Sequence, residues 1–143
     1  MDLKKDNVSV EARIELEVWE GTLNRRERLP QPTLPALREA LLRLDGDRAD
    51  SLWIEIEDAG ALCVGGGPSR FVMVSFRSDG SSAHVVIGPD DGTTVDLQVG
   101  GQTGCYPKVM VLPASLAFEI AERFLEFKEF DPRVAWAVDC PAG

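Results

Sequence analysis

The sequence predicts an α+β fold, in which two helices pack on a mostly antiparallel β-sheet of about six to eight strands. Several short segments alternate apolar and polar residues, which is the period of a half-buried strand. Two longer segments repeat apolar residues every three or four positions, which is the period of an amphipathic helix. Clusters of Gly, Asp, Pro and Ser separate the short segments, and such clusters favour antiparallel hairpins over βαβ units.

The first predicted strand runs from Val8 to Val18 and has the clearest pattern, because every second residue in it is apolar. The polar segment 21–32 is expected to be a loop, and its basic stretch NRRER to be solvated. A helix is predicted over 33–44, with Thr33 as its N-cap and Pro35 in its first turn. Gly46 lies just beyond, where helices commonly end.

The middle of the chain predicts a series of short strands, at 52–57, 61–64, 71–77, 82–88, 93–99 and 106–112. The stretch LCVGGGPSRFVMV, at 62–74, raises the question of a phosphate-binding loop. Such a loop leads into a helix, whereas the residues that follow here have a strand pattern and lack a Gly-Lys-Ser/Thr sequence. The glycines are therefore expected to serve a hairpin turn.

The chain is predicted to close with a helix over 113–130 and a strand over 133–138. Asp131-Pro132 should end the helix, because a residue before proline avoids the helical conformation. With 143 residues, 44% of them hydrophobic, the chain is long and apolar enough for one domain. We expect a single domain over 1–143, with its core at about 7–139 and a loose tail at 140–143.

Composition and charge exclude several classes of protein. No apolar run approaches the roughly 20 residues that a membrane span requires, and the N-terminal segment lacks the apolar stretch of a signal peptide, so a cytoplasmic protein is expected. The net charge of −9 argues against a nucleic-acid partner. The same charge suits a basic protein partner, because opposite potentials speed association.

The three cysteines, Cys63, Cys105 and Cys140, are widely spaced, and an odd number without an export signal indicates free thiols. Neither they nor His84, the one histidine, have the spacing of a metal site. No metal and no cofactor are therefore expected.

No catalytic constellation is evident either. His84 lies mid-strand, and pairing it with Cys63 or Cys105 has no local support. Glu55 and Glu57 point to the same side of a strand and are expected to face solvent. We expect no catalytic residue and no enzymatic activity.

The C-terminal segment YPKVMVLPASLAFEIAERFLEFKEFDPRVAWAV resembles the end of the first-numbered immunity family of bacterial polymorphic-toxin systems. The similar features are Leu112-Pro113 at a strand end, a helix with Ala117, Ala121 and Phe124, and Val134-Ala135-Trp136 in the last strand. Trp53, the strand at 62–64 and the glycine-rich hairpin are also similar, so the likeness covers about 53–138. Where the family commonly has a glycine before the proline of its last turn, this chain has Asp131.

Members of that family include the antidote to a DNA cytosine deaminase toxin. The resemblance implies an immunity protein that binds and sterically neutralises a cognate toxin domain, often a nuclease or a nucleic-acid deaminase. Because such toxins carry basic clefts, we expect exposed acidic residues to contact the partner. The candidates are Glu55, Glu57, Asp58, Asp79, Asp90, Asp91 and Asp96.

Two other functions fit the same sequence. A non-catalytic interaction or ligand-binding domain of a secretion-linked system would have a formed apolar pocket rather than an acidic face. A small enzyme would bring Cys63, Cys105 or the clustered carboxylates together in a cleft.

Overall fold

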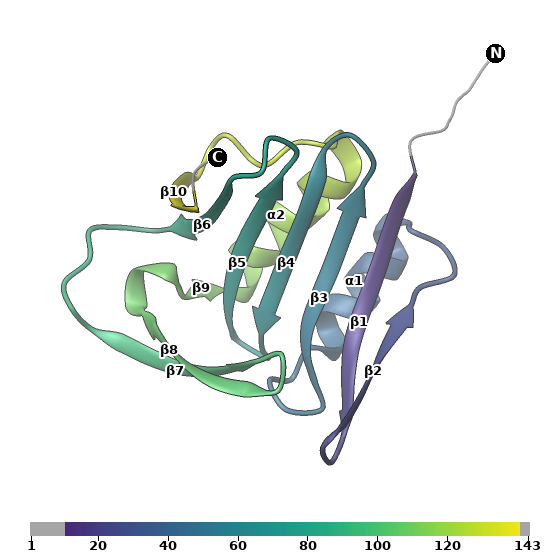
Figure 1. The fold of residues 1–143 in the computed structure, drawn as a ribbon, viewed down its shortest axis with the longest axis horizontal. Coiled ribbons are helices and arrows are strands. Elements are labelled where there is room, and N and C mark those ends of the chain that lie inside the picture. Colours follow the sequence, from purple (N-terminus) through teal and green to yellow (C-terminus); the bar gives the residue numbers. More distant parts are fainter. Residues whose placement is uncertain (1–10, 141–143) are drawn as a thin grey trace.

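The computed structural model of the protein describes residues 11–140, the side chain of Cys140 excepted. The fold is α+β, as predicted (Figure 1). Two helices accompany an eight-stranded sheet with the order β10-β6-β5-β4-β3-β1-β2, in which β9 also pairs with β5. Strands β7 and β8 form a separate two-stranded sheet, hereafter the hairpin. All strand pairings in the described part of the chain are antiparallel.

In chain order the elements are β1 (Ala12–Glu20), β2 (Leu23–Arg28), α1 (Leu34–Arg43), β3 (Ala49–Ile56), β4 (Gly60–Gly66), β5 (Arg70–Arg77), β6 (Ser82–Val86), β7 (Thr94–Val99), β8 (Gln102–Pro107), the 3₁₀ turn η1 (Lys108–Met110), β9 (Leu112–Pro113), α2 (Ala114–Phe127) and β10 (Ala135–Cys140). Residues 8–10 of the first predicted strand and 141–143 of the predicted tail lie outside the described residues. Cys140, also assigned to that tail, is the last residue of β10 and pairs with Ser82 of β6.

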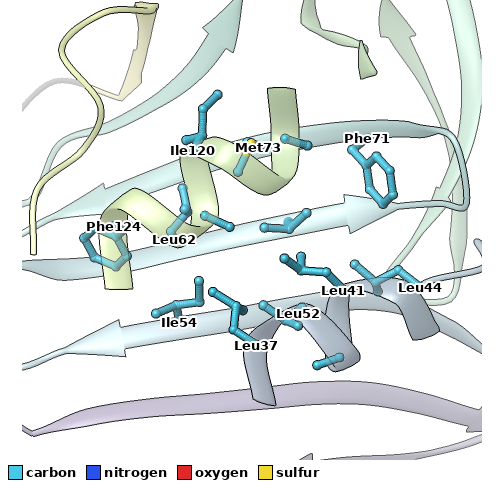
Figure 2. Close-up of a cluster of buried hydrophobic side chains, with 14 of the residues drawn as sticks. Leu37, Leu41, Leu44, Leu52, Ile54, Leu62, Phe71, Met73, Ile120 and Phe124 are labelled. Carbon is cyan, nitrogen blue, oxygen red and sulfur yellow. The ribbon is translucent and has the colours of Figure 1, made fainter. Parts of the chain in front are cut away.

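Both helices pack on one face of the sheet, behind it in the view of Figure 1. Alternate residues of the central strands point to this side, among them Ile54, Leu62 and Met73. They meet Leu37 and Leu41 of α1 and, from α2, Ile120 and Phe124 (Figure 2). Burying one such side chain contributes roughly 1.5–3 kcal/mol, so this layer is the main source of stability.

The predicted helix starts are confirmed, and α2 ends three residues earlier than expected. The Thr33 hydroxyl accepts a hydrogen bond from the backbone N–H of Ala36 at 3.3 Å, which satisfies one of the free donors at the start of α1. At the end of α2, Lys128 adopts a left-handed conformation with φ of 58°. That conformation stops the helix before Asp131-Pro132 can do so.

The prediction of a loop over 21–32 was wrong, because strand β2 lies within it. β2 is an edge strand whose backbone pairs with β1, and Arg26 forms an ion pair with Glu15 of β1 at 3.2 Å. Most of its side chains are exposed on both faces, so its sequence lacks the apolar alternation by which a strand is recognised.

The strand predicted at 106–112 begins earlier, at Gln102. Gly100 and Gly101 have φ values of 63° and 81°, and Val99 pairs directly with Gln102. Two consecutive residues of positive φ form the tight hairpin turn that glycine favours, so GGQTG turns the chain and then continues as β8. The rest of the predicted strand divides into η1 and the short β9.

The hairpin prediction for LCVGGGPSRFVMV is confirmed, because β4 and β5 pair antiparallel as far as Gly66 and Phe71. The apolar residues on either side of the glycines are strand residues of the core. No helix leaves this loop, so it lacks the geometry with which glycine loops bind phosphate.

A buried carboxylate secures the connection between α2 and β10. Asp131 is almost fully buried and accepts hydrogen bonds from Arg133 at 2.9 Å and 2.7 Å. The Arg133 hydrogen bond is the main reason that the pKa of Asp131 lies below its usual range. The backbone carbonyl of Asp131 accepts a hydrogen bond from the Trp136 indole at 2.9 Å, which ties the turn to β10.

Replacing Asp131 by asparagine is expected to lower the free energy of unfolding by about 2 kcal/mol at pH 7, because a charge-assisted pair is lost. The folded-state pKa is depressed, so the contribution is fully present above the unfolded pKa of about 4 and is lost as pH falls through the folded pKa. Urea unfolding from pH 7 to 3 should show the difference between wild type and variant shrinking below about pH 4. Asp58→Asn, at an exposed turn, is the control; an equal loss at every pH would contradict the prediction.

Candidate functional site

The most distinctive surface is the sheet face turned away from the helices, hereafter the open face. It is formed by the strand residues that alternate with the core residues. Across it, Arg13 pairs with Glu55, Glu55 with Ala61, and Ala61 with Phe76. The hairpin lies over one end of this face, near the bottom in Figure 1, where Val99 sits above Gly65. The opposite end, here the free end, carries the β3–β4 and β5–β6 turns, and no described element crosses it.

Two aromatic side chains stack on the open face. The rings of Trp53 and Phe76 have centroids 5.5 Å apart and an interplanar angle of 25°. They come from β3 and β5, and they meet because the residues of β4 between them, Ala61 and Cys63, are small. The Arg26 guanidinium lies 5.4 Å from the Trp53 ring centroid, so the stack begins with a cation–π contact. It ends at Phe76, which is 41% exposed.

A shallow groove of about 500 Å³ opens at the free end, with Phe76 as the aromatic residue of its lining. Glu55 and Glu57 of the groove provide carboxylates, and Arg13 and Arg28 provide guanidiniums. Arg13 donates a hydrogen bond to Glu55 at 2.6 Å, and this bond raises the pKa of Arg13. The groove therefore combines an aromatic surface with charges of both signs, and it is open to solvent.

The structure separates the seven acidic residues of the predicted contact surface into two groups. Glu55, Glu57, Asp58 and Asp79 lie on β3 or on the two turns of the free end. Asp90 and Asp91 lie in the β6–β7 loop, and Asp96 lies on the exposed side of β7. One continuous contact with all seven would have to extend from the free end to the hairpin (Figure 1).

Three of these carboxylates also shape their own turns. Asp79 accepts a hydrogen bond from the backbone N–H of Ser81 at 2.8 Å, Asp90 from that of Gly92 and Asp91 from that of Thr93, both at 2.9 Å. The Ser81 and Thr93 hydrogen bonds lower the pKa values of Asp79 and Asp91. Such local bonds are typical of Asp in turns and need no partner to explain them.

The thiol–imidazole pair considered from the sequence does not form. Cys63 and His84 share the open face, but Val74 of β5 lies between them, which separates their backbones by roughly 10 Å. Burial raises the pKa of Cys63 to about 12, so it is a neutral thiol. His84 instead contacts Asp139 of β10, and Cys105 is exposed on β8.

The aromatic stack was not predicted, although part of it has a sequence signal. Phe76 has no such signal, because the polar residues beside it, Ser75 and Arg77, belong to the opposite phase of the strand. Trp53 lies between Leu52 and Ile54, so it occupies the solvent-facing phase of an alternating strand. An aromatic residue in that phase is a candidate for a binding surface. The contribution of Arg26 depends on β2, which has no such signal.

Among residues 11–140, no three His, Cys, Asp or Glu side chains are grouped so that they could hold a metal ion. Neither helix in the described part is long and apolar enough to cross a membrane. Comparisons of the chain with models of protein families, with curated proteins and with solved structures gave no match.

Proposed function

We propose that this protein is an immunity protein, which binds a cognate bacterial toxin domain through the open face and neutralises it by steric occlusion. The toxin would be a nuclease or a nucleic-acid deaminase, as the resemblance of the C-terminal segment implies. The observation that carries the proposal is the Trp53–Phe76 stack beside the acidic free end. Aromatic side chains in a partly charged surface are typical anchors of protein interfaces.

The architecture suits steric occlusion of a toxin, which requires no catalysed reaction. Strands β3, β4 and β5 are joined edge to edge by continuous backbone pairing, and the helix layer packs on the face opposite the open face. A surface built on such strands is formed before the partner arrives, which reduces the entropy lost on binding. The net charge of −9 would favour encounter with a basic cleft and oppose stable contact with the nucleic-acid substrate of that toxin.

A non-catalytic ligand-binding domain of a secretion-linked system is the second candidate. The groove volume of about 500 Å³ favours it, because small-molecule sites commonly have about 300–1,000 Å³. Such sites are usually lined by apolar side chains, however, whereas half of the residues that line this groove are charged.

The test is capture of the toxin domain encoded next to this protein. The immobilised full chain should retain that domain and abolish its activity at a one-to-one ratio. Retention should weaken when salt rises from 0.1 to 0.5 M, because screening reduces the attraction between exposed charges. A toxin domain that stays fully active at a large excess of this protein would contradict the proposal.

A further inference from the structure

We infer that the groove at the free end receives an arginine side chain of the protein partner, with its guanidinium over Phe76 and beside the carboxylate of Glu57. This inference rests on the proposed function and specifies the chemistry of its contact. It is carried by two features of the described residues, an aromatic surface with an exposed end and an excess of carboxylates around it.

The aromatic surface already binds one guanidinium within the chain. Arg26 lies over Trp53 at 5.4 Å, and Trp53 stacks on Phe76 at 5.5 Å. Two other arginines do the same elsewhere, with Arg77 4.7 Å from the Phe130 centroid and Arg123 5.0 Å from that of Phe127. A second guanidinium at Phe76 would continue the stack at its exposed end. Such contacts are stronger where the site is desolvated.

The charges around the groove favour a cation. Glu11, Glu55 and Glu57 line it, and Asp58 and Asp79 lie on the adjoining turns. Of the two arginines in its lining, Arg13 is engaged by Glu55, and Arg28 is exposed at the end of β2. Arg77, at the end of β5, turns its guanidinium toward Phe130 and Trp136. Within the described residues, carboxylates therefore outnumber guanidiniums at this end.

An exposed aromatic ring beside carboxylates favours arginine over lysine. A guanidinium is planar and weakly hydrated, so it can stack on a ring while its N–H groups donate to a carboxylate. An ammonium is more strongly hydrated and has no flat face to stack. An acidic side chain would be repelled by the glutamates of the groove.

The experiment uses the full chain labelled with ¹⁵N and the probe N-acetyl-arginine amide, with N-acetyl-lysine amide for comparison. Arginine should cause saturable shifts in the NMR signals of Ala61, Phe76 and Glu57, and lysine should bind less tightly. Phe76→Leu and Glu57→Gln should each weaken the arginine affinity about fivefold, which corresponds to about 1 kcal/mol. Phe127→Leu, at an exposed phenylalanine on α2, is the matched control and should leave the affinity unchanged.

Shifts that spread over the acidic surface without saturating, or an affinity equal in wild type and Phe76→Leu, would overturn the inference. The toxin experiment keeps the two proposals apart. If wild type and Phe76→Leu capture the toxin equally well, the arginine contact is wrong and the immunity function stands. If arginine binds the groove and no toxin is neutralised, the function is wrong and the arginine site stands.

Discussion

Replacing Gly67 by alanine is expected to lower the free energy of unfolding by about 3 kcal/mol or more. Gly67 has φ of 112°, which residues with a side chain rarely adopt. A Cβ atom there would lie 2.3 Å from the backbone carbonyl oxygen of Leu44, which is the C-cap of α1. Because backbone cannot move aside as a side chain does, α1 would have to shift away from the sheet.

Chemical denaturation monitored by circular dichroism measures this loss. Gly88→Ala is the matched control, since its added Cβ meets no atom within 4 Å, and its effect should stay within about 0.5 kcal/mol. A Gly67→Ala protein as stable as the control would mean that the β4–β5 turn does not pack against the end of α1.

Replacing Asp50 by alanine is the second change with a large expected effect, a loss of about 3 kcal/mol accompanied by release of the hairpin. Asp50 lies in β3 and is completely buried. Its side-chain oxygens accept hydrogen bonds from the Trp19 indole at 3.1 Å, the Gln98 amide at 3.1 Å and the Gly101 backbone N–H at 2.7 Å. These donors come from β1, β7 and the hairpin turn, so one carboxyl group joins three parts of the chain.

The loss is large because alanine would leave several donors without a partner, and each unsatisfied buried group costs about 1–3 kcal/mol. Hydrogen exchange should rise in β7 and β8 of Asp50→Ala well before it rises in β3 and β4. Asp96 is exposed on the same hairpin, so Asp96→Ala should change neither the free energy of unfolding nor the hydrogen exchange of the hairpin appreciably. Uniform destabilisation without preferential exchange in the hairpin would show that Asp50 does not hold it.

The candidate site could be predicted from the sequence only in part. The carboxylates of Glu55, Glu57, Asp58 and Asp79 are visible as polar residues at strand ends, and the structure places them at one end of the sheet. Asp90, Asp91 and Asp96 have the same appearance in the sequence, yet they lie on the β6–β7 loop and the hairpin. The spacing of residues along the chain does not show which turns lie at the same end of the sheet, because the order of the strands in the sheet differs from their order in the chain.

The local and periodic part of the fold follows directly from the order of the residues. Alternation identified the buried phase of β1, β3 and β7, and the leucine spacing with Thr33 identified α1, because both depend only on neighbouring residues. The tertiary structure alone decided that the hairpin covers one end of the open face and leaves Phe76 exposed at the other. It also decided that β2 is a strand, since β2 is held by backbone pairing with β1 across a tight hairpin turn and its exposed side chains show no apolar alternation.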